Sequence, residues 1–480
     1  MPLEQKQAVP IENSRTVKEA VIIGGGPAGI FAALSAKKAD PNLSVMVLEK
    51  TSRLLSKVRI SGGGRCNVTN ASFDPLSCAS HYPRGGKELI GPFHRFGPKE
   101  TIDWFLSKGV FLKREADGRV FPKSNRSQTI IDCLLKEARE AGVDIRLEQD
   151  VEKILKNSCG LFEITFKERK AILAKTLLIA TGSHPQGYRL AQSLGHSIEL
   201  PVPSLFSFHI PSSSLRSLSG IALQEVQLEL LQTPFIPNAL EKLDLGRRES
   251  SRGSTIESRP ILDIWGEMQS LNPEALAQPK FQFLKCVRYK QKGALLITHF
   301  GLSGPAVLKL SAWAARYLHD KNYRAELAVD WLPGSTSEKS YQKLCSFKTQ
   351  LPHTTLAAAN PFDLPKNLWK VLIHPLQGAV LDISLKSLKV LAEKLHDDRY
   401  LIEGKSVHKE EFVTCGGVAL KEIDFKTMQS KVCKGLFFAG EILDIDALTG
   451  GFNFQNAWTT GYIAGQSLAR ACAQPYTERT

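Results

Sequence analysis

Residues 21–33 read Val-Ile-Ile-Gly-Gly-Gly-Pro-Ala-Gly-Ile-Phe-Ala-Ala, and residues 45–50 read Val-Met-Val-Leu-Glu-Lys. An apolar run leads into Gly-x-Gly-x-x-Gly, a helix-forming stretch follows, and a second apolar run ends in an acid. This is the order of a dinucleotide-binding βαβ unit. Gly24 is expected to permit the tight turn, Gly26 to let a pyrophosphate approach the backbone at the helix N-terminus, and Gly29 to let the helix pack on the strand. Glu49 has the spacing of the acid that binds the ribose hydroxyls.

The composition indicates a soluble globular protein of several domains. A chain of 480 residues is too long for one core, so we expect two or three domains. Its hydrophobic content of 42% is ordinary, and no apolar run approaches the roughly 20 residues that span a membrane. The nine cysteines are scattered without a CxxC pair, which is typical of reduced thiols. Since residues 1–18 are polar and lack a signal core, we expect a disordered tail there and a cytoplasmic protein without membrane contact.

The chain is basic, with a formal net charge of +14. Residues 81–126 hold ten Lys or Arg against five acids, a net charge of +5. Two interpretations stay open: a generally solvated basic surface, or a polyanionic partner such as RNA. Most of the aromatic residues that interleave with these charges are expected to be core residues. They are Tyr82, Phe93, Phe96, Trp104, Phe105, Phe111 and Phe121.

The rest of the chain alternates short strands and helices. An amphipathic helix is predicted over 129–141, and a buried strand over 176–182 ends in Ala-Thr-Gly. Pro201-Val-Pro203 indicates a boundary, and residues 246–259 are polar and predict an exposed loop. Further strands are predicted near 144–147, 151–156, 162–166, 205–210, 226–231, 281–289, 294–298 and 324–331, and helices within 303–318 and 335–397.

The C-terminal segment predicts the second half of a dinucleotide site. Residues 435–441 read Gly-Leu-Phe-Phe-Ala-Gly-Glu, a buried strand that ends in Gly440 and an acid. Two glycines and three carboxamide residues then open a helix of small residues. Glu441 is expected to accept a hydrogen bond from a ribitol, and the helix N-terminus to stabilise negative charge on a flavin. Because elements from both ends of the chain contribute, we favour FAD over NAD.

Several motifs resemble those of the BaiN/RdsA-type FAD-dependent oxidoreductases. Residues 57–70 read Lys-Val-Arg-Ile-Ser-Gly-Gly-Gly-Arg-Cys-Asn-Val-Thr-Asn, similar to that family's SGGGRCNxTN signature. The stretches at 298–306, 413–418, 427–431, 440–441 and 449–456 match as well. The resemblance covers nearly the whole chain after the tail and implies an α/β fold. It divides the chain into a Rossmann-like FAD-binding domain built from both termini (19–200 and 413–475), an inserted β-barrel-like domain (201–332 and 400–412) and a small helical domain (335–399).

The motifs and the resemblance together give the expected FAD-binding residues. They are Gly24, Gly26, Pro27, Ala28, Gly29, Glu49, Lys50, Arg59, Gly63, Gly64, Arg65, Asn67, Thr181, Gly182, Gly440, Glu441, Gly450, Gly451, Asn453, Gln455 and Asn456. No histidine or cysteine spacing is typical of a metal site, so no metal is expected.

The resemblance also implies a reaction, the reduction of an activated C=C bond by hydride transfer from flavin N5. Named activities of the family are a bile-acid enone reductase and a dihydrouridine synthase acting on large-subunit ribosomal RNA, and some members are described as aminoacetone-oxidase-like. The basic charge favours a uridine of ribosomal RNA, or of its precursor, as substrate. A small enone or amine is the alternative, and a non-catalytic FAD-containing RNA-binding or assembly protein is a third hypothesis. Without a second Gly-x-Gly-x-x-Gly, NAD(P)H is a possible electron donor that docks transiently; the oligomeric state is open.

Cys66 and His299 are the candidate catalytic residues. Cys66 is a candidate proton donor, with the alternative of a small buried cysteine under the flavin. His299 precedes a Gly-Leu-Ser-Gly-Pro turn and is a candidate acid, with the alternative of a structural hydrogen bond. The chain departs from the family pattern after Gly182, where it is shorter, and over 232–285, where it is longer. Both departures concern the substrate side of the site.

Overall fold

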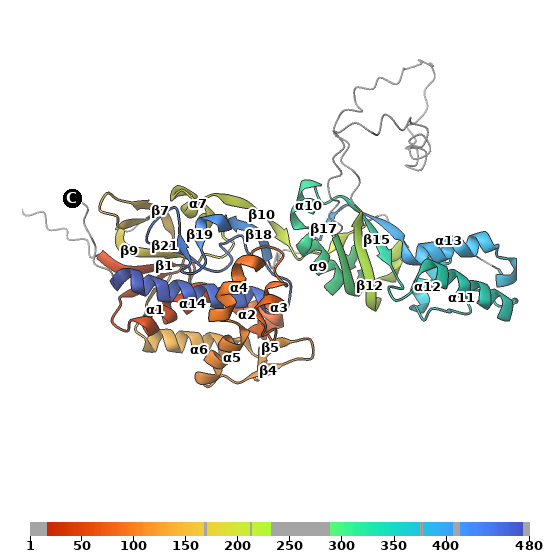
Figure 1. Ribbon diagram of the computed structural model, residues 1–480, viewed down its shortest axis with the longest axis horizontal. Helices are drawn as coiled ribbons and strands as arrows, with labels where there is room; N and C mark the ends of the chain where they lie inside the picture. Colours follow the sequence, from red (N-terminus) through yellow and green to blue (C-terminus); the bar gives the residue numbers. More distant parts are fainter. Residues whose placement is uncertain are drawn as a thin grey trace, which may run out of the picture.

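The computed structural model describes residues 17–167, 170–211, 214–231, 289–374, 376, 378–406 and 413–473. It shows an elongated molecule of two regions, one built on a nine-stranded sheet and one on a seven-stranded sheet (Figure 1). The predicted loop at 246–259, most of the predicted strand at 281–289 and most of the predicted tail lie outside the described residues.

The nine-stranded sheet confirms the predicted βαβ unit. Strand β1 pairs in parallel with β2 on one side and with β9 on the other, and helix α1 connects β1 to β2. Because β1 starts at Val17, the predicted tail was two residues too long. The C-terminal strand β21 pairs in parallel with β9, so both ends of the chain share this sheet. The strand order is β19-β20-β21-β9-β1-β2-β6, with the hairpin β7–β8 attached to β9. The bounds are β1 Val17–Ile23, β2 Val45–Leu48, β6 Asp144–Arg146, β7 Val151–Lys156, β8 Phe162–Phe166, β9 Ile172–Ile179, β19 Ile423–Asp424, β20 Gln429–Ser430 and β21 Leu436–Phe438.

Two helices of small residues lie side by side against this sheet (Figure 1). They are α1, Pro27–Ala39, and the C-terminal α14, Phe452–Ala473. A Cβ added to Gly465 would lie 2.2 Å from the carbonyl oxygen of Ala32, so the two backbones approach as closely as glycine allows. The remaining helices of this region are α2 Ser56–Gly64, α3 Pro75–Ala79, α4 Gly86–Arg95, α5 Pro98–Ser107, α6 Ser127–Glu140 and α7 Pro185–Ser193.

A small three-stranded sheet, in the order β3-β5-β4, completes this region. Its strands are β3 Thr69–Asn70, β4 Leu112–Arg114 and β5 Arg119–Pro122. The basic stretch 81–126 surrounds it, and the prediction that its aromatic residues are mostly core is confirmed for Tyr82, Phe93, Phe96, Phe105 and Phe121. Trp104 is half-buried and Phe111 is 60% exposed, so the prediction that most of these residues are core is confirmed.

The inserted region is built on an antiparallel sheet of seven strands, ordered β16-β15-β12-β13-β14-β11-β17. The two edge strands of this sheet, β16 and β17, are separated in the chain by Glu403 alone. A sheet whose opposite edges are neighbours in the chain has to curve back on itself, which is barrel-like geometry. Its strands are β11 Phe208–His209, β12 Ala222–Leu231, β13 Tyr289–Thr298, β14 Gly301–Ser303, β15 Ala325–Asp330, β16 Asp398–Ile402 and β17 Gly404–Lys405.

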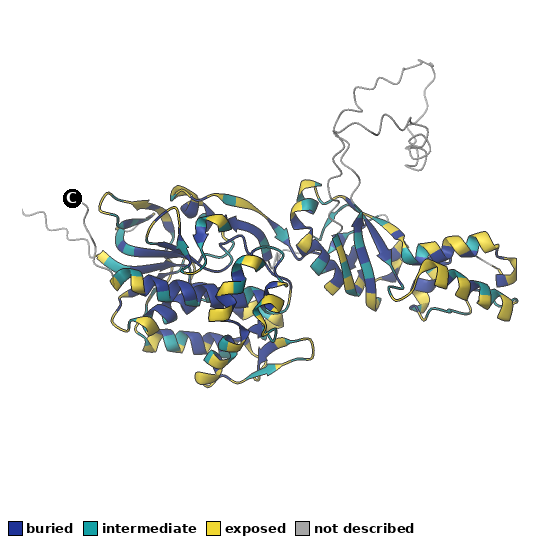
Figure 2. Cartoon of the chain, viewed as in Figure 1, coloured by how far each residue is buried: buried dark blue, intermediate teal, exposed yellow. Residues whose placement is uncertain are grey.

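Helices at 305–396 share one apolar core with this sheet. The helices are α9 Pro305–Trp313, α10 Ala315–Asp320, α11 Ser337–Gln350, α12 Lys366–Leu372 and α13 Leu385–His396. Buried faces turn inward in both regions, and exposed residues cover α11 and α13 at the far end (Figure 2). The two regions are joined by β10 Ile198–Ser204 and β18 Val413–Val418, which pair with each other in antiparallel fashion.

Candidate cofactor and substrate cavity

A cavity of about 1290 Å³ opens at the carboxyl ends of the parallel strands β2, β1, β9 and β21. The residues that follow these strands line it, among them Glu49 after β2, Gly24 after β1, Thr181 after β9 and Gly440 after β21. Ligands of open α/β sheets bind at this edge. Because β2 and β21 are three strand spacings apart, the cavity spans about 14 Å of sheet edge, enough for an extended ligand.

The first glycine motif has the conformation that its predicted roles require. Gly24 has a φ of +112°, and a Cβ there would lie 2.4 Å from the carbonyl oxygen of Ala180. A Cβ on Gly29 would lie 2.0 Å from the carbonyl oxygen of Gly24, so this glycine permits close packing of α1. Gly26, the N-cap of α1, has no other atom within 4 Å of its Cβ position and lines the cavity. The open side of the turn thus faces the cavity together with the free N–H groups of the helix.

Backbone hydrogen bonds fix the carboxylate of Glu49 at one end of this edge. It accepts from the N–H of Gly25 at 2.8 Å and from the N–H and hydroxyl of Thr51, each at 2.8 Å. The side chain lines the cavity, where its remaining lone pairs suit a ribose hydroxyl.

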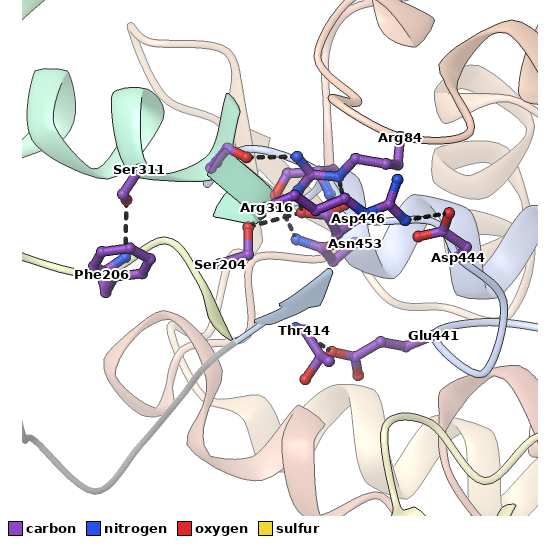
Figure 3. A network of polar contacts seen from close by, with 12 residues as sticks. Arg84, Ser204, Phe206, Ser311, Arg316, Thr414, Glu441, Asp444, Asp446 and Asn453 are labelled. Carbon is purple, nitrogen blue, oxygen red and sulfur yellow. Dashed lines mark hydrogen bonds and ion pairs between the residues drawn. The ribbon is translucent and has the colours of Figure 1, made fainter. Parts of the chain in front are cut away.

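Glu441 occupies the corresponding place after β21. It pairs with the ammonium of Lys57 on α2, and it accepts from the N–H of Thr414 at 3.3 Å (Figure 3). Gly440 before it has a φ of +78°, and its Cβ would lie 2.8 Å from the Cβ of Ala28. This glycine therefore lets β21 end directly against the start of α1.

The start of α14 forms the third part of the cavity wall. Gly450 and Gly451 have positive φ values, and a Cβ on Gly451 would lie 2.4 Å from the carbonyl oxygen of Thr69. The carboxamide of Asn453 holds the preceding turn through two hydrogen bonds of 3.0 Å to the backbone of Ala447. The N-termini of α1 and α14 thus both border the cavity, and each is a site for negative charge.

These residues fit an FAD molecule. The hydroxyl oxygen of Thr181 is buried in the wall without a hydrogen-bond partner among the described residues, as expected of an atom that awaits a ligand. Gly26 leaves open space at a helix N-terminus, and Glu49 and Glu441 offer acceptors on opposite sides of it. The chemistry suits two ribose-like polyols joined by a pyrophosphate.

Most of the residues predicted to bind FAD line this cavity. They are Gly24, Gly26, Pro27, Ala28, Glu49, Lys50, Gly63, Asn67, Thr181, Gly182, Gly440, Glu441, Gly450, Gly451 and Asn453. Their roles in FAD binding stay predictions, and the structure places all of these residues around one cavity.

Six predicted residues do not line the cavity. Gly29 packs α1, and Gly64 lies at the exposed end of α2. Arg59 donates to Gln128, and Arg65 pairs with Glu115 over the ring of Phe121. Gln455 and Asn456 are buried in the first turns of α14, where Gln455 accepts from the hydroxyls of Thr69 and Thr101. The carboxamide spacing therefore indicated the helix start correctly, although two of its side chains face the protein interior.

Neither candidate catalytic residue lines the cavity. Cys66 is fully buried, and burial raises the pKa of its thiol to about 12. His299 lies in the exposed turn between β13 and β14, with its carbonyl oxygen accepting from Arg216. The structure therefore offers no support for either as the proton donor, and it agrees with the alternative of a packed cysteine.

The sequence analysis missed four cations that line the cavity: Arg53, Lys57, Arg119 and Lys405. Lys57 and Arg119 stand beside recognised motifs, and the periodicity of a short helix would have placed Lys57 on the cavity side of α2. Lys405 comes from the inserted region, together with Leu205, Ser406 and Val413. No local pattern marks it, because its position depends on how the two regions meet.

A buried polar network joins the two regions beside the cavity (Figure 3). The guanidinium of Arg84 pairs with the fully buried carboxylate of Asp446 and donates to the carbonyl oxygen of Ala312 on α9 at 2.5 Å. Ser204 donates to the same carboxylate at 2.7 Å. Arg316 on α10 adds a pair with Asp444, at 2.7 Å. Both acids belong to the loop between β21 and α14, so this loop is held from the inserted region as well.

No cluster of three or more His, Cys, Asp or Glu side chains suited to a metal ion occurs among the described residues. None of the helices in the described ranges combines the length and apolar character of a membrane span.

Comparisons with known proteins place this chain in a family. Residues 18–467 match the family model described as the HI0933-like protein Rossmann domain. The chain is 27% identical over 460 residues to the 3-dehydro-bile acid delta(4,6)-reductase of Clostridium scindens, covering 93% of this chain and 98% of that protein. It is 27% identical over 481 residues to the ribosomal RNA dihydrouridine synthase of Escherichia coli, and 28% identical over 473 residues to that of Haemophilus influenzae. Each of these two matches covers 94% of this chain and 98% of the relative. The predicted family is thereby confirmed: the chain belongs to the HI0933-like Rossmann-domain family, a family of FAD-binding oxidoreductases.

Proposed function

We propose that this protein is an FAD-dependent reductase that converts a uridine of large-subunit ribosomal RNA into dihydrouridine, with NAD(P)H as electron donor. The observation that carries the proposal is the match over almost the full length to two relatives that bear the name ribosomal RNA dihydrouridine synthase. The net charge of +14 supports it, because a basic protein gains affinity for a polyanion.

The arrangement of the cavity supports a reductive role. Bound FAD, once reduced by NAD(P)H, supplies a hydride to an electron-poor carbon of a C=C bond conjugated to a carbonyl, and a proton on the neighbouring carbon completes the product. Two hydrogen atoms are gained and one NAD(P)H is consumed. Glu441, paired with Lys57, orients a ribitol hydroxyl, and the N-terminus of α14 stabilises negative charge beside it. Leu205, Val413 and Leu448 pack as one apolar cluster at this end and limit the access of water.

A small-molecule enone is the second candidate substrate. The similarity to the bile acid reductase is as extensive as that to the RNA-modifying relatives. Apolar side chains at the same end of the cavity favour it: Ile60, which is 55% exposed, and the cluster of Leu205, Val413 and Leu448. Such a wall suits a hydrophobic ligand as well as the face of a base.

The test is mass spectrometry of ribosomal RNA from a strain that lacks this gene. The proposal predicts that one nucleotide of the ribosomal RNA is about 2 Da lighter in this strain than in wild type, because an unmodified uridine has two hydrogen atoms fewer than dihydrouridine. The wild-type gene, but not a Gly26→Val variant, should restore the heavier nucleotide. Unchanged ribosomal RNA, together with NAD(P)H-dependent reduction of a steroid enone by the purified protein, would replace the RNA substrate with the small-molecule one.

A further inference from the structure

The cavity extends beyond the residues that fit FAD. Its volume of about 1290 Å³ exceeds the roughly 300–1,000 Å³ typical of pockets for a single small ligand. At one end of it, residues 448–451 line the cavity together with Leu205, Lys405, Ser406 and Val413. Leu448 packs against Leu205 and Val413 there, and the carbonyl oxygen of Gly450 accepts from Asn70 of β3 at 3.1 Å. A second ligand beside the flavin is thus bordered by both regions of the molecule.

Arg119 stands on one side of this space. It opens β5 next to Gly118, whose Cβ position lies 3.0 Å from the side chain of Asn70, and it lines the cavity. Its Nε donates to Asp117 at 2.5 Å, and the side chains of this ion pair are 46% and 47% exposed. An ion pair this exposed contributes little to stability, so Asp117 orients the guanidinium without competing strongly against a bound anion.

Lys405 lines the same cavity from the inserted region. It ends β17, which pairs with β11 at Phe208, and its ammonium lies 5.1 Å from the ring centre of Tyr323. Among the described residues of the inserted region that line the cavity, Lys405 alone is charged; the others are Leu205, Ser406 and Val413. The half-buried side chain and its aromatic neighbour keep the cation at the wall.

We propose that Arg119 and Lys405 form a cationic clamp that binds the phosphates on the two sides of the base presented to the cavity. This inference rests on the proposed RNA substrate. A base that reacts inside a cavity has to leave the stack, and its flanking phosphates then remain at the mouth. Arginine and lysine are the side chains that hold such phosphates, and they fix the register of the strand. The apolar cluster of Leu205, Val413 and Leu448, which lines the same cavity, would receive the base.

The experiment uses the FAD-loaded protein and a fluorescein-labelled, mixed-sequence single-stranded RNA of 12 nucleotides. Anisotropy titrations at several salt concentrations give the affinity and its salt dependence for wild type, Arg119→Ala and Lys405→Ala. Each lost phosphate contact should reduce the log–log salt slope by about 0.7 and weaken binding about five- to tenfold at low salt. Arg114→Ala is the matched control, because Arg114 is an exposed cation of the same hairpin that does not line the cavity. Lys405→Arg keeps the charge and should retain the wild-type slope.

The outcomes separate the clamp from the proposed function. If wild type binds the RNA and both alanine variants keep its affinity and slope, the clamp is wrong while the RNA substrate stands. A loss in Arg114→Ala equal to that in Arg119→Ala would also overturn the clamp, because binding would then follow general charge. If only one of the two alanine variants loses affinity and slope, the clamp is wrong for the other residue. Absence of RNA binding by wild type at low salt would contradict both the clamp and the RNA substrate.

Discussion

The two walls of the cavity expose different chemical groups. The wall on the nine-stranded sheet is rich in glycine, in the turns after the strands and at the N-termini of α1 and α14, and exposes backbone there. The wall on the inserted region consists of the side chains of Leu205, Lys405, Ser406 and Val413. Backbone groups recognise what every flavin dinucleotide shares, namely a pyrophosphate and two polyols.

This difference separates the part of the site that binds the cofactor from the part that can vary with the substrate. A backbone wall tolerates little change, since a Cβ at Gly24, Gly440 or Gly451 would meet another atom at 2.8 Å or less. A side-chain wall can be altered one residue at a time without loss of the cofactor. Relatives that share this fold and differ in their named substrates, a bile acid and a ribosomal RNA, are therefore expected to differ mostly on the inserted side.

The largest effect is expected from Gly26→Val. The φ of Gly26 is −80°, so the backbone accepts a side chain, but the added atoms occupy the open space in front of α1. The protein should fold and retain no FAD, measured as flavin absorbance per mole of purified protein. Gly91→Val on α4 is the control, because Gly91 also has no atom within 4 Å of its Cβ position and lies away from the cavity. A Gly26→Val protein with stoichiometric FAD would refute the backbone wall.

The second-largest effect is expected from Arg84→Ala, because this change breaks the polar network that joins the two walls. The carboxylate of Asp446 has no exposed surface, and losing its partner leaves an unpaired buried charge, at a cost of about 3–5 kcal/mol. Urea denaturation should show this as an earlier transition. Lys99→Ala removes the partner of Asp103 in an exposed pair and should leave the urea transition almost unchanged. Equal costs for the two variants would show that the network does not hold the regions together.

Intermediate effects are expected at the two acids of the backbone wall. Glu49→Ala and Glu441→Ala each remove a charged acceptor from the cavity, which should weaken FAD binding by about 1.5–3 kcal/mol. Flavin fluorescence titration of the apoprotein measures this loss. Glu140→Ala, at the exposed end of α6, serves as the control. If both cavity variants bind FAD as wild type does, the assignment of ribose and ribitol to these acids is wrong.

The smallest effect is expected from Cys66→Ala, because Cys66 is not among the residues that line the cavity. The thiol is buried and does not line the cavity, so turnover should stay within about twofold of wild type. Because burial raises the pKa of Cys66 to about 12, the thiolate is scarce at pH 8 and becomes common only as the pH rises towards 12. Iodoacetamide at pH 8 should therefore modify the exposed Cys159 and spare Cys66, as peptide mass spectrometry can check. A loss of turnover with normal FAD content would restore Cys66 as a catalytic candidate.

Much of the nine-stranded region could be predicted from the sequence, because its signals are local. Alternating or continuous apolar runs gave β7 and β8 with their exact bounds, and the glycine spacing gave the turn from β1 to α1. The start of β1 was missed because Val17 and Lys18 extend the strand into a polar stretch, and their pairing with Leu173 and Ala174 is a tertiary contact. Tertiary context also decides which of the aromatic residues at 81–126 is exposed, and the sequence did not single out Phe111.

The candidate site was predictable where a residue's role depends on its own motif. Gln455 and Asn456 show the limit, since the motif identified the start of a helix but not which of its side chains turn inward. Arg84, Asp446 and Lys405 were missed for a different reason. Their roles arise from contacts between segments more than 200 residues apart, such as Arg84 with Ala312 and with Asp446. No spacing within one sequence window records such contacts.

Because both ends of the chain share one sheet, the two halves of the nucleotide site are synthesised at different times. Strand β1 and Glu49 leave the ribosome early, whereas β21 and Glu441 come almost 400 residues later, near the end of the chain. At roughly 5–20 residues per second, the nascent chain carries half a nucleotide site for about 20–80 s. During that interval the carboxyl edge of β9 has no β21 beside it, and α1 has no α14 to cover it. The protein can therefore bind its flavin only after most of the chain has been synthesised. A ribosome that stops before residue 440 releases a chain that lacks part of the cofactor site.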